Sequence, residues 1–262
     1  MVDHTPASVG DVTESPTSPD KVEIPEDSRK VHLVVDLTGE NPQLVLDLRP
    51  SLTPDAALLV APRWKLRVKR LVDVLGAALA LLVLTPVLLA VAAAVKLTSK
   101  GPVLFKQRRV GENSREFSFY KFRSMRLNAE GERDDLIDLN EVKSPVFKIR
   151  ADPRLTPVGR FMRRTSIDEL PQLWNVLRGH MSLVGPRPLP REEADLCSDW
   201  KSQRVAVKPG MTCIWQVSGR SELDFETWVR MDIEYIEKWS LWFDVKLLAR
   251  TVPAVLSGRG AY

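Results

Sequence analysis

The feature that most constrains this chain is an uncharged stretch of 22 residues, Val74 to Val95. All of its residues are aliphatic except Gly76, Thr85 and Pro86. As an α-helix the stretch would run about 33 Å, and the hydrocarbon core of a bilayer is about 30 Å thick. This length indicates a membrane helix and disfavours a buried helix of a soluble core.

Basic residues flank this stretch on both sides. Five precede it and five follow it: Arg63, Lys65, Arg67, Lys69 and Arg70, then Lys96, Lys100, Lys106, Arg108 and Arg109. Because basic residues favour the cytoplasmic side, a spanning helix would leave one cluster outside. A helix broken at Thr85-Pro86 would enter and leave by the same face, since proline removes a backbone donor and threonine can bond the freed carbonyls. The pattern predicts a re-entrant membrane helix hairpin over residues 61–100, with a plain spanning helix as the alternative.

Charge is distributed unevenly along the chain. Residues 1–60 hold 11 acids and 4 bases, residues 61–126 hold 3 acids and 14 bases, and residues 127–262 hold 20 of each. The basic block requires an anionic partner. Nucleic acid is disfavoured because the uncharged stretch lies inside that block. The two cysteines, Cys197 and Cys213, are too few for a disulfide framework and favour a reducing compartment.

The first sixty residues divide into two parts. Residues 1–30 carry seven acids and four prolines with few aliphatic residues, which predicts a disordered acidic tail. No basic start followed by an apolar run is present there, so we expect no cleaved secretion signal and an N-terminus in the cytoplasm. Residues 31–60 form a short variable segment, in which leucines and valines alternate on both sides of residues 39–42 and predict a hairpin.

Residues 101–262 have the pattern of a soluble domain. Val103-Leu104-Phe105 and Phe117-Ser118-Phe119-Tyr120 predict two short strands around a turn at Gly111-Glu112-Asn113. Helical spacing follows, and the helical segment Phe225 to Leu256 is rich in tryptophan and tyrosine, which suit either a core or a membrane interface. We expect an α/β-containing (α+β), mostly helical domain behind the membrane helix hairpin.

Two adjacent carboxylates, Asp168 and Glu169, are the main candidates for chemistry. Pro171 cannot donate a backbone hydrogen bond, so it must lie in the first turn of a helix. This predicts Asp168 as the N-cap and Glu169 as the first helical residue, with Gly179 ending the helix. The helix dipole would favour ionised carboxylates and a phosphate there, which makes Asp168 a candidate nucleophile toward phosphorus. Helix capping with a solvated ion pair explains the same residues without chemistry.

Basic residues elsewhere in the chain are candidates for gripping phosphate. Arg163 lies just before the two carboxylates, and Lys121 and Arg123 follow the second predicted strand. Arg187 lies between two prolines, and a fixed guanidinium suits a bidentate contact to phosphate. For any one of them, a solvated or salt-bridged surface base is the simpler explanation.

Six motifs occur in order along the chain: Lys69-Arg70-Leu71-Val72-Asp73, Gly101 to Gly111, Lys121-Phe122-Arg123-Ser124-Met125, Ser166 to Gln172, Met181 to Pro188, and Gly260-Ala261-Tyr262. Together they resemble one family closely, the bacterial sugar transferases, which are monotopic polyprenyl-phosphate phosphoglycosyl transferases. The resemblance runs from about Lys69 to Tyr262, or 194 of 262 residues.

The resemblance implies a reaction. A sugar 1-phosphate would pass from a UDP-sugar to undecaprenyl phosphate, with release of UMP, as the first membrane step of exopolysaccharide or surface-glycan synthesis. Asp168 would attack the phosphate next to the sugar and form a covalent phosphosugar. Glu169 would assist with Mg²⁺ (or Mn²⁺) or with the incoming lipid phosphate, and both carboxylates are expected metal ligands. The expected contacts of the substrate phosphates are Lys121, Arg123, Arg163, Arg187, Gln107 and Arg109.

The resemblance also implies a location and partners. A lipid acceptor requires chemistry at a membrane face, so we expect the catalytic domain, residues 101–262, on the cytoplasmic face of the inner membrane and in contact with membrane lipid. The resemblance leaves undecided whether the protein forms a homodimer. Trp215 and the aromatic C-terminal segment are similar to the branch that uses galactose or glucose.

A rival hypothesis is a non-catalytic membrane adaptor, in which the basic block binds anionic lipid and the acidic tail recruits a partner. It explains the uneven charge but gives Asp168, Glu169 and Arg187 no purpose.

Overall fold

The computed structural model describes residues 32–36, 43–47, 56–141, 146–195, 203–258 and 260, which belong to two units, residues 1–49 and 50–262. In the first unit, strand β1 (His32–Asp36) pairs antiparallel with β2 (Gln43–Asp47), and Leu33 lies opposite Leu46. The alternating pattern therefore predicts this hairpin correctly. The disordered tail expected at residues 1–30 lies outside the described residues.

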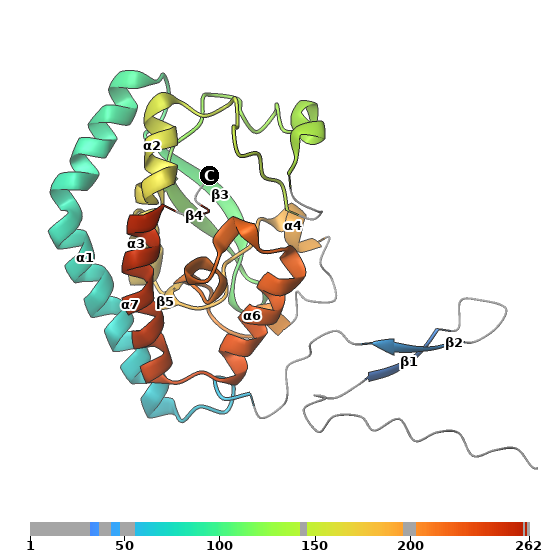
Figure 1. Ribbon diagram of the computed structural model, residues 1–262. Coiled ribbons are helices and arrows are strands. Elements are labelled where there is room, and N and C mark those ends of the chain that lie inside the picture. Colours follow the sequence, from blue (N-terminus) through green and yellow to red (C-terminus); the bar gives the residue numbers. More distant parts are fainter. Residues whose placement is uncertain are drawn as a thin grey trace, which may run out of the picture. The chain divides into compact units, whose positions relative to one another are not determined.

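The uncharged stretch lies in a single helix, α1 (Arg63–Thr98), which runs along one side of the second unit (Figure 1). Among the described residues, α1 is the one helix long and apolar enough to cross a membrane. It stays helical through Pro86, and Figure 1 shows it curved along its length. The Thr85 hydroxyl donates to the Leu81 carbonyl oxygen at 2.7 Å, a bond that often bends helices. The predicted long apolar helix is present, whereas the two arms of a hairpin are not confirmed.

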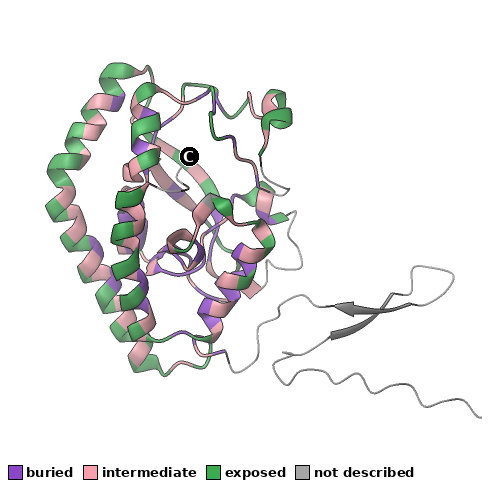
Figure 2. Cartoon of the chain, viewed as in Figure 1, coloured by how far each residue is buried: buried purple, intermediate pink, exposed green. Residues whose placement is uncertain are grey.

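The outward face of α1 is apolar and exposed. Only 6% of its most apolar 18-residue stretch is buried, and Figure 2 shows exposed residues all along its outer side. The exposed aliphatic residues include Leu71, Val72, Leu75, Leu79, Leu82, Val83 and Leu89. A continuous apolar surface of this kind is unfavourable in water and suits lipid.

The inward face of α1 contacts strand β5 (Ser182–Val184) through a buried carboxylate. Asp73 accepts hydrogen bonds from the Ser182 hydroxyl at 3.0 Å and from the Leu183 N–H at 2.9 Å. One turn further along, a Cβ atom at Gly76 would lie 2.9 Å from a methyl carbon of Leu183. The absence of a side chain at residue 76 thus lets the helix approach the strand closely.

A partly buried lysine on α1 holds the other end of β5. Lys69 donates to the Val184 carbonyl oxygen at 3.1 Å and forms an ion pair with Asp244 at 2.6 Å. The Tyr235 hydroxyl bonds the same two groups, at 3.0 Å and 2.8 Å. Because every partner in this network is satisfied by another, the lysine charge is tolerated away from water.

The far end of α1 also packs on the second unit. Val95 is 1% exposed and contacts Phe122 and Met162 in an apolar cluster. Arg123 donates through one nitrogen to the carbonyl and hydroxyl oxygens of Ser99, just beyond the helix. Both ends of α1 are therefore attached to the same body of protein.

Two further strand arrangements lie in this unit. Strand β3 (Leu104–Val110) pairs antiparallel with β4 (Glu116–Phe122), joined by a turn that contains a 3₁₀ segment at Glu112–Ser114. Strand β5 pairs in parallel with β6 (Gly210–Thr212). The first pair confirms the two strands and the turn that the sequence predicts.

The rest of the unit is mainly helical. The helices are α2 (Pro157–Thr165), α3 (Gln172–Leu177), α4 (Arg191–Asp195), α6 (Phe225–Glu237) and α7 (Leu241–Ser257), with 3₁₀ turns at Asp134–Leu139, Ile167–Glu169, Trp215–Val217 and Arg220–Glu222. This combination of helices and two-stranded sheets agrees with the predicted α+β class.

The aromatic C-terminal segment is mostly core. Trp228, Tyr235 and Trp239 are each 5% exposed or less, whereas Trp242 is 64% exposed at the start of α7. Tyr235 and Trp239 pack in one apolar cluster with Leu247 of α7. Helical spacing of tryptophans here reflects packing of α6 and α7, with Trp242 as the exception.

Replacing Asp73 by alanine tests the attachment of α1. The change leaves the Ser182 hydroxyl and the Leu183 N–H without their partner, so we expect the free energy of unfolding to fall by about 1 to 3 kcal/mol. Denaturant unfolding in detergent measures it. The control is Asp135→Ala at an exposed position, which should change it by less than about 0.5 kcal/mol. Equal effects of the two changes would contradict the attachment.

Candidate active site

Asp168 and Glu169 lie in a tight turn between α2 and α3. Helix α2 ends just before Ser166, which adopts the left-handed conformation with φ 55° and reverses the chain. Residues 167–169 then form one 3₁₀ turn, and α3 begins only at Gln172. The prediction that Asp168 caps the following helix is therefore wrong, because a separate turn intervenes. The end of α3 is as predicted, with Gly179 at φ 80° directly after it.

Close packing against β4 and the loop after it fixes this turn from both sides. On the α2 side, a Cβ atom at Gly159 would lie 1.8 Å from the Ser124 carbonyl oxygen, so only glycine permits the contact. On the α3 side, the Asn175 amide donates to the Ser118 carbonyl at 2.6 Å and accepts from the Tyr120 N–H at 3.3 Å. Both helices that carry the turn are thus held to the same strand.

The turn faces a cleft of about 1130 Å³. Seven of the eight predicted catalytic and phosphate-binding residues line it: Gln107, Arg109, Lys121, Arg163, Asp168, Glu169 and Arg187. Arg123 is the exception, because it is buried and its guanidinium reaches Ser99 at the end of α1. Four separate motifs of the sequence therefore meet in one cleft.

Glu169 and Arg187 form a bidentate ion pair in this cleft. Arg187 Nη1 donates to Glu169 Oε2 at 3.0 Å, and Nη2 donates to Oε1. Although burial opposes ionisation, the charge and hydrogen bonds of Arg187 lower the pKa of Glu169 to about 2. The pKa of Arg187 is raised despite its burial, because Glu169 stabilises the cation. Both groups stay charged at neutral pH, and the plane of the guanidinium is fixed.

Asp168 has a different environment. It is 5% exposed, and none of the described residues donates a hydrogen bond to it. Burial raises the pKa of Asp168, and the neighbouring charge of Glu169 adds to this, while Lys121, Arg163 and Arg187 oppose it. A carboxylate that is short of hydrogen bonds and of water is more basic and less hindered than an ordinary one, as a nucleophile requires.

The cations of the cleft are themselves under electrostatic strain. Burial and the charge of Arg109 lower the pKa of Lys121 to about 7. Burial and the charge of Arg187 lower the pKa of Arg109 to about 9. So many buried cations repel one another, and a bound polyanion would relieve that repulsion. The cleft is therefore suited to a ligand with several negative charges.

The loop that carries Arg187 is held closely against β6. The Gly185 N–H donates to the Thr212 carbonyl at 3.0 Å, and the Gly210 N–H donates to the Pro186 carbonyl at 2.9 Å. A Cβ atom at Gly210 would lie 2.0 Å from the Gly185 nitrogen, so any side chain would force the two segments apart. The glycines after Val184 and before Met211 thus serve the close approach of two backbones.

Arg109 and Gln107 support this loop as well as lining the cleft. Arg109 Nη1 donates to the Pro188 carbonyl oxygen at 2.7 Å, and two other nitrogens of Arg109 donate to Gln107 Oε1 at 3.2 Å each. The Arg109 guanidinium also lies over the Phe119 ring, 4.1 Å from its centre. All three nitrogens of this side chain are thus engaged, which leaves little capacity for a substrate.

Arg220 and Lys148 also line the cleft, and sequence reasoning did not single them out as site residues. Arg220 has a left-handed backbone with φ 52°, and its carbonyl accepts from the Trp228 indole N–H at 3.1 Å. A strained backbone at a cleft residue points to function. The glycine before Arg220 is the one sequence signal for it, and Lys148 has none because it lies in an irregular segment.

One wall of the cleft is apolar and belongs to two helices. Leu84 and Val87 of α1 flank the Thr85-Pro86 step, and Leu248 and Val255 come from α7. Leu170, next to the carboxylates, lies on the same wall. The cleft thus joins a charged centre to the apolar face of α1.

The donor set for a metal is small. Within the described parts of the chain, no group of three or more His, Cys, Asp or Glu side chains could hold a metal ion. Mg²⁺ is usually bound through one or two carboxylates together with substrate phosphates and water. Asp168 and Glu169 fit that pattern only in company with a phosphate ligand, because Arg187 already occupies both oxygens of Glu169.

Comparison with known proteins agrees with this geometry. A family model described as "Bacterial sugar transferase" matches residues 64–258. The chain belongs to the bacterial sugar transferase family. The matched range of this sugar transferase begins at the start of α1 and includes every residue of the cleft described above except Gly260.

Three relatives of the sugar transferase illustrate its similarity to known proteins. The galactosyl transferase CpsE of Streptococcus agalactiae is 45% identical over 194 residues, which cover 74% of this chain and 43% of CpsE. The UDP-glucose:undecaprenyl-phosphate glucose-1-phosphate transferase of Escherichia coli is 42% identical over 202 residues, 74% of this chain and 41% of the relative. The exopolysaccharide production protein ExoY of Rhizobium meliloti is 39% identical over 198 residues, 74% of this chain and 88% of ExoY. The sugar transferase therefore spans less than half of the first two relatives and most of ExoY.

The pKa of Lys121 predicts how ligand binding depends on pH. The side chain is a cation below about pH 7 and neutral above it, whereas a diphosphate probe such as UDP-glucose keeps its charge. We expect the affinity for UDP-glucose to fall by about tenfold as the pH rises from 6 to 9, because one charged hydrogen bond is lost. Calorimetric titration measures this fall. Lys121→Arg, which stays charged, should show a smaller fall, the remainder coming from Lys148, whose pKa burial lowers to about 8 in the same cleft. An equal fall in Lys121→Arg would contradict the assignment.

Proposed function

We propose that this sugar transferase moves a sugar 1-phosphate from a UDP-sugar to undecaprenyl phosphate and releases UMP. The sugar is a hexose, galactose or glucose, in line with the names of CpsE and of the Escherichia coli relative. The reaction would initiate synthesis of an exopolysaccharide, the process named for ExoY. The observation that supports this proposal is the buried, unhindered Asp168 beside the Glu169–Arg187 pair in a cationic cleft.

The first half of the reaction forms a covalent phosphosugar on Asp168. A carboxylate oxygen attacks the phosphorus next to the sugar, an O–P bond forms, and the bond from that phosphorus to the bridging oxygen breaks. UMP leaves with the electron pair of the broken bond. Arg163, Lys121 and Arg187 line the cleft and would screen the diphosphate from the carboxylate and stabilise the charge on UMP.

The second half returns the carboxylate. A phosphate oxygen of the lipid attacks the same phosphorus, the bond to Asp168 breaks, and the product is a lipid diphosphate sugar. The apolar wall with Leu84, Val87 and Leu248 lies where an isoprenoid chain would approach from the membrane. Glu169 remains ionised throughout and keeps the Arg187 guanidinium directed at the cleft.

The proposed reaction uses Mg²⁺ (or Mn²⁺) as its cofactor. Asp168 and Glu169 would hold the ion together with the substrate phosphates, and the ion would supply positive charge to neutralise the transferring phosphate. Glu169 would have to share its oxygens between the ion and Arg187.

The proposed location is the cytoplasmic face of the inner membrane, with α1 re-entrant. Its two ends carry basic residues, and both ends attach to the same unit, through Lys69 and Asp73 at one end and Val95 at the other. A straight spanning helix would draw one end of that unit across the bilayer. An α1 that bends at Thr85-Pro86 and returns keeps both ends, and the unit, on one side.

Removing the nucleophile tests the reaction. Asp168→Asn keeps the shape of the side chain, so the protein should fold and bind membrane, but UMP release should fall by at least about 10³-fold because no covalent phosphosugar can form. The measurement is UMP release from a panel of UDP-sugars, with protein in detergent or lipid, Mg²⁺ and polyprenyl phosphate. The control is Asp138→Asn at an exposed position, which should be fully active.

Two outcomes would count against the proposal. A fully active Asp168→Asn protein would contradict the nucleophile. No release by the folded wild-type protein with any UDP-sugar, together with release from membranes by salt, would favour the membrane adaptor.

Thiol labelling tests the topology. With one cysteine at the exposed Glu226 and another within residues 1–30, in separate variants, both should be shielded from an impermeant thiol reagent in intact cells, because both lie in the cytoplasm. Permeabilised cells should label both and serve as the control. Labelling of the tail position alone in intact cells would show a spanning helix.

A further inference from the structure

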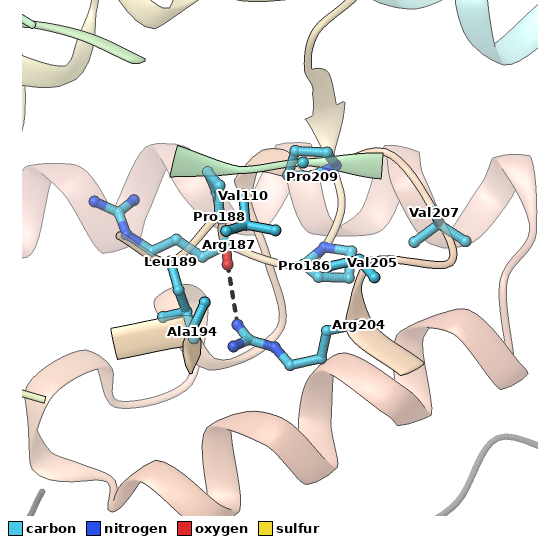
Figure 3. A pocket seen from close by; sticks show the side chains of 11 residues that line it. Val110, Pro186, Arg187, Pro188, Leu189, Ala194, Arg204, Val205, Val207 and Pro209 are labelled. Atoms are coloured by element: carbon cyan, nitrogen blue, oxygen red, sulfur yellow. Dashed lines mark hydrogen bonds between the residues drawn. The ribbon is translucent and has the colours of Figure 1, made fainter. Parts of the chain in front are cut away.

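The backbone of Arg187 is held from behind by a second buried arginine. Figure 3 shows the small pocket behind the loop, lined by Val110, Pro186, Pro188 and Val205, with the Arg204 side chain reaching to the carbonyl of Arg187. Arg204 Nη2 donates to that carbonyl oxygen at 3.0 Å. The contact lies on the backbone, so it leaves the Arg187 guanidinium available to Glu169.

Arg204 is itself fixed by Asp232 on α6. Arg204 Nε donates to Asp232 Oδ2 at 2.9 Å, and Nη2 lies 2.6 Å from the same oxygen. The two side chains are 7% and 0% exposed. Arg204 Nη2 therefore joins the carboxylate of α6 to the carbonyl of Arg187.

A buried ion pair is a poor means of stabilising a fold, because the loss of hydration offsets most of the attraction. Apolar side chains of similar volume would pack this place at no such cost. What apolar side chains cannot do is donate a hydrogen bond to the carbonyl of residue 187. Among the described residues, Arg204 is the one donor to that carbonyl.

We propose that Arg204 and Asp232 are positioning residues, which hold the backbone of Arg187 so that its guanidinium meets Glu169 and the substrate phosphates. This inference rests on the proposed function of the cleft. Neither residue lines the catalytic cleft, and Arg204 reaches it through the backbone carbonyl of Arg187. The link runs from Asp232 to Arg204 and on to the backbone of Arg187, whose guanidinium pairs with Glu169. Each step is a hydrogen bond.

The first experiment separates positioning from folding. The double change Arg204→Met with Asp232→Leu removes both charges together and leaves apolar groups of similar size, so we expect an unchanged or higher Tm. The kcat/KM for the UDP-sugar should nevertheless fall by about 10- to 100-fold, as is typical when a partner behind a site residue is lost. The matched control is Arg230→Met with Glu226→Leu, an exposed pair on the same helix, which should leave kcat/KM unchanged. A folded Arg204→Met, Asp232→Leu protein with full activity would overturn the proposal.

The second experiment asks whether the effect passes through Arg187. Arg187→Lys keeps a cation in the cleft, so turnover should remain measurable, but it cannot form the bidentate pair. Adding Arg204→Met and Asp232→Leu to Arg187→Lys should lower kcat/KM by less than about twofold more, because the group being positioned is already lost. A further loss as large as in the wild-type background would show that the pair acts elsewhere and would refute the inference. Turnover by the wild-type and control proteins tests the proposed function independently of these outcomes.

Discussion

Two side chains one turn apart on α1, the partly buried Lys69 and the buried Asp73, hold strand β5 at its two ends, and the placement of the cleft depends on this contact. Asp73 accepts from Ser182 and Leu183, and Lys69 donates to Val184. The loop with Arg187 follows β5 directly. The apolar helix α1 is therefore held in a fixed position relative to the cationic side of the cleft. The three-residue strand β5 connects the two.

The same cleft shifts the pKa values of two neighbouring carboxylates in opposite directions. Glu169 has a bidentate arginine, and its pKa falls to about 2, whereas Asp168 has burial and a negative neighbour, and its pKa rises. Adjacent residues differ in this way because the 3₁₀ turn points their side chains in different directions. One carboxylate becomes a permanent counter-ion and the other a basic group with no fixed partner. This division of roles requires the left-handed Ser166, which ends α2 before the turn.

How far the sequence predicts this structure depends on the range of the interactions. The long apolar helix, the β3–β4 pair and the end of α3 near Gly179 follow from local patterns and are confirmed. The N-cap at Asp168 was wrong because serine seldom adopts a left-handed conformation, so Ser166 carries no sequence signal for it. The gathering of separate motifs in one cleft came from family resemblance rather than from residue patterns. The Arg204–Asp232 pair joins residues 28 positions apart and leaves no periodicity to read.

A transfer between a water-soluble donor and a lipid requires one cavity that is charged at one part and apolar at another. Here the charged part comes from loops and turns of the soluble unit, and the apolar part comes from α1 and α7. Excluding water on the apolar side strengthens the electrostatic interactions of the buried cations with a phosphate. It also raises the cost of leaving those cations without an anion, as the lowered pKa of Lys121 shows. Helix α1 therefore contributes part of the cleft itself, because its Leu84 and Val87 line the same cleft as the carboxylates.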